Sequence, residues 1–261
     1  MKAYEIMEAL KAESTHVHDN LHVDTLKAGC KDKEVRKIAT CFIATPDVIR
    51  EAAAWGADLL ITHEPTFYNH RDFNGEIPDD PVMQAKKKLL ESAGMTVYRY
   101  HDHAHDHEPD VISIGQVNAL PWDCEFDGHF LLTLKTPMTA REMAADIEKC
   151  WGIARVRLTG DLDTPMTKIA LLIGAYGDEK HYQYLRDTDC EVLIVGETNE
   201  WRIGEYVRDG AQMGFRRALL TCGHAGSEKA GMEYLVKHLE EKFDGIKAKY
   251  FECGEVYSYL K

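Results

Sequence analysis

The sequence lacks several features, and each absence excludes or disfavours a class of protein. Its most apolar segments, residues 38–46 and 169–177, are far shorter than the roughly 20 residues of a bilayer-spanning helix. It has no long Lys/Arg run, and 31 Lys and Arg against 44 Asp and Glu give a net charge of −13. A general nucleic-acid surface is therefore disfavoured, since phosphate binding needs clustered cations. With 44% apolar and 29% charged residues, the composition is that of an ordinary soluble globular protein.

Closely spaced cysteines are also missing. The seven cysteines are odd in number and no two lie closer than 11 residues, which excludes CxxC zinc motifs and argues against a disulfide framework. Glu5 and Glu8 stand where a signal peptide would need an apolar core. No P-loop, GxGxxG or GxSxG motif occurs. We therefore expect a cytoplasmic protein with reduced thiols, no membrane segment and neither nucleotide-loop nor serine-hydrolase chemistry.

Apolar stretches alternate with helical patterns from about residue 36 onward, which predicts an α/β protein with partly parallel sheets. The first stretches predict a strand over 38–44, a helix over 48–55, a strand over 58–62, a helix over 81–93 and a strand over 95–100. Thr45 with Pro46 is typical of a helix start, and Gly56 and Gly94 of helix ends.

The second part of the chain repeats this order in outline. The pattern predicts a strand over 128–134, a helix capped by Thr139, helices over 182–186 and 202–211, strands over 191–195 and 217–221, and a final helix over 228–243. A new strand and helix follow residues 122–127, which predicts two related α/β halves, 1–127 and 128–261. The boundary is approximate, and the two halves could interdigitate. In open α/β sheets sites form at the carboxyl ends of strands, so we expect the functional crevice there.

Histidine is abundant, and its placement is informative. Among thirteen histidines, His101, His103, His105 and His107 alternate within seven residues. In extended backbone, alternate side chains project to the same side, so three or four imidazoles could face one point. The alternative is a solvated loop rich in His and Asp. His16, His18 and His22 form another histidine-rich patch without a companion carboxylate motif, and we expect it at the surface.

Three predicted strand ends carry potential metal ligands. His63 and Glu64 follow the strand over 58–62, and the 101–107 tract follows the strand over 95–100. His224 and Glu228 begin the last helix four residues apart, so one helical turn places an imidazole and a carboxylate on one face. Such pairs are also common on ordinary helix surfaces. The coincidence of three such ends favours a metal site.

Four stretches together resemble the Nif-three-like family of dinuclear-metal proteins, whose bacterial members are called GTP cyclohydrolase I type 2 homologues. Residues 38–49 with 57–65 resemble the family's strand, Thr-Pro helix and Thr-His-x-Pro motif. Residues 97–105 fall on its Val-Tyr-x-x-His motif, residues 155–161 with 168–177 on its central glycine-turn region, and residues 223–228 on its terminal Gly-His-x-x-Ser-Glu. The match covers most of the chain in the right order.

The resemblance implies a ligand set with two exchanges. Glu64 stands at the family's second histidine and His105 at its ligand aspartate, and each exchange keeps a side chain that can bind metal. The implied metal ligands are His63, Glu64, His101, His105, His224 and Glu228. His103 and His107 are further candidates from the same tract. Asp102 and Asp106 are candidates to orient imidazole N–H groups.

Two divalent ions per chain, with a bridging water or hydroxide, would suit metal-assisted hydrolysis of an unidentified small-molecule substrate. Glu228 would be the bridging carboxylate, and Glu64 and Glu228 the catalytic carboxylates. Mixed imidazole and carboxylate ligands suit Zn, Fe, Mn, Co or Ni without choosing among them. The resemblance also implies a homohexamer. The alternatives are a non-catalytic protein that stores, delivers or senses metal, and a cofactor-free α/β scaffold with a fortuitous histidine loop.

Overall fold

The computed structural model describes residues 1–14, 22–72 and 80–260. The chain forms two compact units. Unit 1 comprises Met1–Val111 and Met232–Gly254, and unit 2 comprises Ile112–Gly231 and Glu255–Lys261. Each unit contains one β-sheet, and the two units are described separately below.

The sheet of unit 1 is parallel except at one edge. Its five strands lie in the order β1-β4-β3-β2-β11. Their bounds are β1 Leu26–Ala28, β4 Thr96–Arg99, β3 Leu59–Thr62, β2 Lys37–Cys41 and β11 Lys247–Tyr250. Strand β1 pairs antiparallel with β4, whereas β4, β3, β2 and β11 run parallel. The carboxyl ends of β3 and β4 are therefore neighbours, and each leads into one of the predicted ligand motifs.

Local signals in the sequence start and end the helices of unit 1 where expected. Helix α2 (Pro46–Trp55) begins where the Thr45 hydroxyl accepts a hydrogen bond from the Val48 amide at 3.2 Å. It ends at Gly56, whose φ of 84° is in the left-handed region that glycine adopts without strain. Helix α3 (Pro81–Ala93) is capped by Asp80 in the same way and ends at Gly94. These predictions are confirmed.

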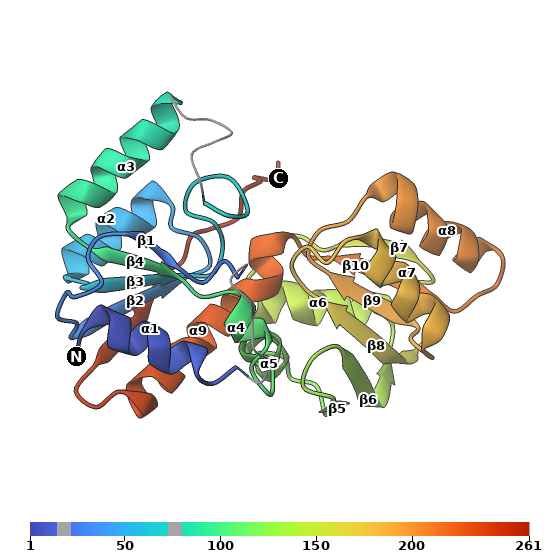
Figure 1. Cartoon of the computed structure of the whole chain (residues 1–261). Coiled ribbons are helices and arrows are strands. Elements are labelled where there is room, and N and C mark those ends of the chain that lie inside the picture. Colours follow the sequence, from blue (N-terminus) through green and yellow to red (C-terminus); the bar gives the residue numbers. More distant parts are fainter. Residues whose placement is uncertain (15–21, 73–79, 261) are drawn as a thin grey trace. The chain divides into compact units, whose positions relative to one another are not determined.

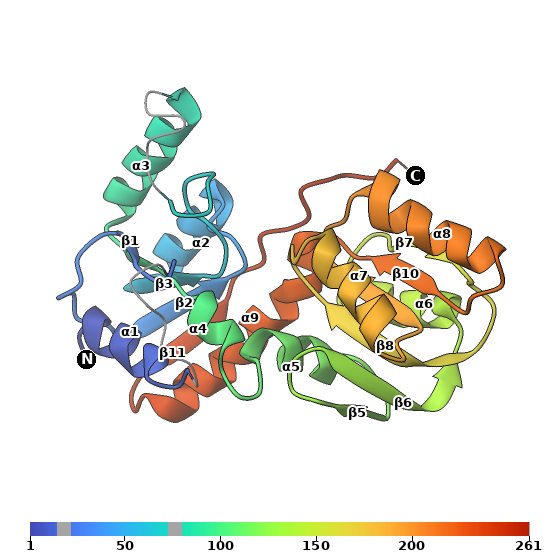
Figure 2. The same ribbon diagram turned by 45° about the vertical axis from the view of Figure 1, so that its right-hand side comes forward.

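Helices cover both faces of the unit 1 sheet (Figures 1 and 2). Helices α2 and α3 lie on one face, and α1 (Ala3–Lys11) and the part of α9 (His224–Lys242) from Met232 onward lie on the other. The face under α2 and α3 carries a buried cluster that includes Ala39, Leu60, Val97, Ile49 and Met83. Burying both faces explains why every residue of β3 and β4, and every residue of β2 after Lys37, is buried rather than alternately buried and exposed.

Unit 2 has a mixed sheet of six strands in the order β5-β6-β8-β9-β10-β7. Their bounds are β5 Cys124–Phe126, β6 Leu131–Met138, β8 Met166–Leu172, β9 Val192–Val195, β10 Ala218–Thr221 and β7 Arg157–Gly160. The central strands β8, β9 and β10 run parallel, and the pairings at both edges are antiparallel. This mixture confirms the predicted α/β class with partly parallel sheets.

The helices of unit 2 follow the sequence pattern with local differences. Their bounds are α5 Val111–Asn118, α6 Ala140–Cys150, α7 Asp178–Asp187 and α8 Glu205–Gln212, with a π-helical turn over Glu200–Gly204 before α8. Thr139 and Glu142 form the capping box that starts α6. A buried cluster that includes Leu172, Leu193 and Leu219 of the sheet lies with Leu185 of α7 and Val207 of α8.

The end of the chain is shared between the units. Strand β11 pairs with β2, so Met232–Gly254 belongs to unit 1 together with the first segment, which ends at Val111. The sequence suggested a boundary near 122–127 and allowed for interdigitated halves. All seven cysteines are free thiols. Among the described residues, no helix combines the length and the apolar character needed to cross a membrane.

Candidate metal centre

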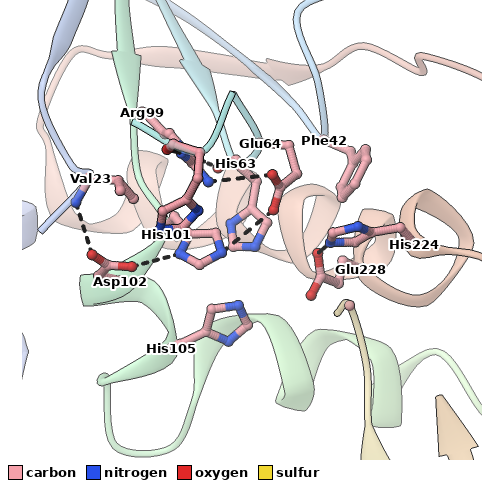
Figure 3. Close-up of polar contacts among 12 residues, drawn as sticks. Val23, Phe42, His63, Glu64, Arg99, His101, Asp102, His105, His224 and Glu228 are labelled. Carbon is pink, nitrogen blue, oxygen red and sulfur yellow. Dashed lines mark hydrogen bonds and ion pairs between the residues drawn. The ribbon is translucent and has the colours of Figure 1, made fainter. Parts of the chain in front are cut away.

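Three imidazoles of unit 1 converge at the ends of two adjacent strands (Figure 3). His63 follows β3, His101 follows β4, and His105 lies in the short helix α4 (Asp102–His105). Each offers a ligand atom, and these atoms lie within 4.8 Å of one another. The His63 ring stacks on that of His101 with centroids 4.6 Å apart, and each lies 5.0 Å from the His105 ring in an edge-on arrangement.

Each of these rings is held through the same nitrogen. The Nδ1 of His63 donates to the carbonyl of Tyr100 at 3.0 Å, that of His101 to Asp102 at 2.8 Å, and that of His105 to Asp110 at 2.9 Å. A proton on Nδ1 leaves the lone pair on Nε2. This pattern is common among metal-binding histidines, because a second acceptor fixes both the tautomer and the ring orientation. The three side chains therefore fit a divalent ion with nitrogen ligands.

The histidine tract is helical, so its predicted extended conformation is wrong. Residues 102–105 form α4, and in a helix the side chains four positions apart, not two, share a side. His101 and His105 consequently meet, whereas His103 turns to the buried carboxylate of Asp24, 2.6 Å from its Nδ1. The tract thus contributes two of its four histidines to this cluster.

Asp24 causes this turn, and the sequence analysis missed it. Its buried carboxylate accepts hydrogen bonds from the backbone amides of His101, Asp102 and His103 at 2.8 to 3.0 Å. These are the unpaired donors at the start of α4, so Asp24 caps the helix from a distant segment. Burial alone would raise the pKa of Asp24, but the hydrogen bonds from His103 and His101 bring it below its ordinary value.

Arg99 positions the loop that carries His63 and Glu64. Its fully buried guanidinium donates from Nε to the carbonyl of His63 at 2.9 Å, and its Nη2 lies 3.3 Å from Glu64 Oε2. The other oxygen of Glu64 lies 3.5 Å from Nε2 of His101. Glu64 therefore presents one oxygen to the arginine and one to the imidazole cluster (Figure 3).

The His101 environment favours a neutral ring. Burial lowers the pKa of His101 to about 4, and the neighbouring His63 and His105 rings act in the same direction, against the hydrogen bond to Asp102. A neutral imidazole is the form that binds metal, so at neutral pH no proton has to leave before His101 can act as a ligand.

Unit 2 carries the second group of predicted ligands. Helix α9 starts at His224, four residues earlier than expected, so Glu228 lies one full turn into the helix. His224 Nε2 lies 3.2 Å from Glu228 Oε2, and its Nδ1 contacts Glu197 at 2.9 Å. The side chain of Glu228 is nearly fully buried. The predicted imidazole and carboxylate do share one helix face (Figure 3).

Glycines allow the start of α9 to approach the sheet of unit 2. A Cβ at Gly174, after β8, would lie 2.1 Å from Glu228 Oε1 and 3.3 Å from His224 Nε2. A Cβ at Gly196, after β9, would lie 2.6 Å from the Ser227 hydroxyl, which itself accepts a hydrogen bond from the Gly174 amide at 3.0 Å. Gly174 lies in the stretch that resembles the family's glycine-turn region, and Gly196 follows the predicted strand over 191–195. Their missing side chains leave the space that Glu228 and Ser227 occupy.

The remaining histidine predictions have mixed outcomes. His16 and His18 lie outside the described residues. His22 is half-buried, with its ring 4.9 Å from that of His103 in an edge-on contact. The Nδ1 of His107 donates to the carbonyl of Pro109 at 3.0 Å, and this residue belongs to a different group of side chains, with Glu13 and His238.

Two predicted orienting residues also differ. Asp102 holds the His101 ring as expected, but the acceptor at His105 is Asp110 and not Asp106. Asp24, Arg99 and Asp110 are all buried charged residues; Asp24 and Asp110 lie outside the recognised motifs, and Arg99 stands at an unspecified position of the Val-Tyr-x-x-His motif. The only sequence signal for them is a charge next to a strongly apolar stretch, which is too common to single them out.

Fold and site define a class: an α/β protein whose strand ends present histidine and carboxylate groups suited to metal. Residues 1–254 match the model of the Duf34/NIF3 (NGG1p interacting factor 3) family, and the chain belongs to this family. The expected resemblance is therefore confirmed.

Similar proteins include two curated relatives named GTP cyclohydrolase 1 type 2 homolog. The one from Clostridium perfringens is 24% identical over 84% of this chain and 83% of its own length, and the one from Clostridium acetobutylicum is 26% identical over 82% and 80%. A crystal structure of a Bacillus cereus protein related to NIF3 covers 100% of this chain and 99% of its own, with a TM-score of 0.80 and 14% identity. At that identity, the structural likeness establishes the fold.

Proposed function

We propose that this protein binds two divalent metal ions per chain and catalyses a metal-dependent hydrolysis. The ligands in this proposal are His63, Glu64, His101 and His105 of unit 1 and His224 and Glu228 of unit 2. The observation that carries it is the convergence of three imidazoles, each with an acceptor at Nδ1 and with ligand atoms that lie within 4.8 Å of one another. Bound divalent ions in such sites lower the pKa of water and polarise the group under attack.

The residues of the chain have separate roles in this proposal. Arg99 fixes the backbone of His63 and one oxygen of Glu64, which leaves the second oxygen as the oxygen donor among imidazoles. Glu228 has two carboxylate oxygens and is the candidate for binding both ions. Asp102 and Asp110 accept hydrogen bonds from Nδ1 of His101 and His105, which orients each ring and leaves its Nε2 lone pair for a metal. Glu64 and Glu228 are the proposed catalytic carboxylates.

Metal analysis of protein purified without a histidine tag tests the ligand set. We expect about two ions per chain to survive dialysis in the parent, and fewer in His63→Ala and in His224→Ala. His129→Ala is the matched control, because His129 lies in the turn between β5 and β6 and is not one of the proposed ligands. Metal content unchanged by the double replacement of His63 and His224 would contradict the proposal.

Catalysis needs a separate test. Phosphoesters, cyclic amides and nucleotides should be assayed from pH 5 to 9 while metal content is measured in the same samples. We expect activity that rises with metal occupancy and disappears in Glu228→Gln. Full occupancy without turnover on any substrate would favour the non-catalytic alternative, a protein that stores, delivers or senses metal. The name of the clostridial relatives suggests hydrolytic chemistry and does not identify the substrate of this chain.

The remaining expectations complete the proposal. We propose that the protein is a homohexamer, as the family resemblance implies. We also propose that it lies in the cytoplasm, where free cysteines stay reduced. Native mass spectrometry of the untagged protein tests the assembly. A monomer at micromolar concentration would contradict it.

A further inference from the structure

A second group of potential metal ligands lies in unit 1, outside the proposed ligand set. Glu13 follows α1, His107 follows α4, and His238 lies in the second half of α9. Each offers one ligand atom, and these atoms lie within 4.8 Å of one another. The three residues come from distant parts of the sequence, so their convergence is a product of the fold of unit 1.

Backbone pairing and helix geometry place these side chains. Ser14 and His107 form an isolated antiparallel bridge, which brings the segment after α1 beside the segment after α4. His238 approaches from α9, with its ring 5.9 Å from that of His107 in an edge-on contact. Its Nε2 lies 2.9 Å from Glu13 Oε2.

Contacts outside the group fix the ring of His107 and one oxygen of Glu13. The Nδ1 of His107 donates to the carbonyl of Pro109 at 3.0 Å, so the lone pair of this ring lies on Nε2. Glu13 uses its two oxygens differently: Oε1 accepts from the Lys242 ammonium at 2.8 Å, and Oε2 faces His238. One carboxylate oxygen is thus paired with a lysine, and the other contacts His238 within the 4.8 Å group.

The carboxylate is held in its charged form. Burial alone would raise the pKa of Glu13, but hydrogen bonds from His238 and Lys242 bring it below its ordinary value. The side chains remain partly accessible, with exposed fractions of 18% for Glu13 and 29% for His238, so an ion can reach them from solvent. Two imidazoles and one carboxylate are a ligand set that zinc accepts in proteins, with a fourth position left for water.

We propose that Glu13, His107 and His238 form a separate divalent-metal site, suited to zinc, that joins the segments after α1 and α4 to helix α9. An ion there replaces the direct contact between His238 and Glu13, and Lys242 continues to hold the other oxygen of Glu13. Because the site connects three segments of the folded unit, zinc binding stabilises unit 1. This site does not depend on the proposed function of the His63 and His224 groups.

Zinc titration of metal-free, untagged protein tests the site. We expect His107→Ala and His238→Ala each to bind one equivalent of zinc fewer than the parent and to lose part of the zinc-induced rise in melting temperature. His107→Ala is the cleaner variant because it leaves the contacts of Glu13 with His238 and Lys242 in place. His129→Ala is the control and should titrate like the parent.

Two results would overturn the proposal. The first is a zinc titration of His107→Ala and Glu13→Gln that matches the parent in equivalents and affinity. The second is a crystal of the zinc-soaked protein without anomalous scattering at these residues. The group would then be an ion-paired contact between α9 and the residue after α1. If the proposed function is wrong, the zinc equivalents that depend on His63 and His224 are missing instead. The titration therefore distinguishes failure of the proposed function from failure of this site.

Discussion

The two units hold their donor groups by different means. In unit 1, buried charged side chains position the imidazoles: Asp24 caps α4, Arg99 holds the His63 loop, and Asp110 orients His105. In unit 2, close backbone packing positions the donors, because Gly174 and Gly196 leave room for the first turn of α9. The first arrangement depends on hydrogen bonds and the second on the absence of side chains.

This difference predicts which kind of substitution disrupts the donor groups of each unit. A hydrogen-bonded arrangement fails when an acceptor is removed, since a buried donor without a partner costs free energy. A close-packed arrangement fails when a single methyl group is added. Substitutions of each type should therefore act on one unit and leave the donors of the other in place.

The largest expected effect is that of Asp24→Ala in unit 1. The change leaves three backbone amides at the start of α4 and the ring of His103 without their acceptor, so we expect a loss of about 4 kcal/mol in the free energy of unfolding. Urea denaturation of the metal-free protein measures it. Asp47→Ala is the control, because Asp47 is exposed and makes a surface ion pair with Arg50, for which we expect less than about 1 kcal/mol. Equal effects of the two variants would refute the role of Asp24.

In unit 2, Gly174→Ala should cost about 3 kcal/mol. Its φ of 71° is unfavourable for alanine, and the new Cβ would lie 2.1 Å from Glu228 Oε1. Gly214→Ala is the control, because Gly214 also has a positive φ, of 90°, but no atom lies within 4 Å of the Cβ that alanine adds. This variant therefore measures the conformational cost alone, about 1 kcal/mol. Denaturation curves of both variants measure the difference. A Gly174→Ala variant as stable as Gly214→Ala would mean that the contact with Glu228 does not matter.

Lys86 is a buried cation of unit 1 outside the imidazole cluster, and its replacement should change the free energy of unfolding by less and in the opposite direction. Burial lowers the pKa of Lys86 from 10.5 to about 8. Below pH 8 the lysine is charged in both states and its burial destabilises the fold, so Lys86→Met should raise the free energy of unfolding by about 2 kcal/mol at pH 7.

The same variant predicts a pH dependence. Between pH 8 and 10.5 the unfolded chain keeps the proton that the folded chain has lost, so the stability of the parent rises with pH and the advantage of Lys86→Met disappears. Thermal or urea denaturation at pH 7 and pH 10 measures this. Lys88→Met, at an exposed position of the same helix, is the control. An advantage of equal size at both pH values would show that it does not come from the buried charge.

The smallest expected effect concerns metal preference. His105→Asp replaces an imidazole of unit 1 by a carboxylate, which favours harder ions, so we expect the affinity for Mn relative to Zn to rise about tenfold. Competition binding of the two metals measures the ratio, with His224→Asp as the corresponding change in unit 2. An unchanged ratio in His105→Asp would remove His105 from the proposed ligands.

The sequence by itself determined the α/β class and many of the elements. Thr45, Pro46 and Gly56 set the limits of α2 through local caps, and Thr139 with Glu142 starts α6 in the same way. Apolar runs at β3 and β9 identified buried parallel strands, and the order of the motifs identified the family. These features are local in the chain, or are patterns of neighbouring residues, and sequence patterns report them directly.

Only the tertiary structure decided which side chains act together. The tract over 101–107 is a helix because Asp24, about eighty residues earlier, accepts its first amides, and this cap turns His103 away from His105. The site of Glu13, His107 and His238 likewise depends on contacts between segments far apart in the sequence. Such groupings follow from the packing of whole elements, and the residues on either side of each ligand carry no local pattern that encodes them.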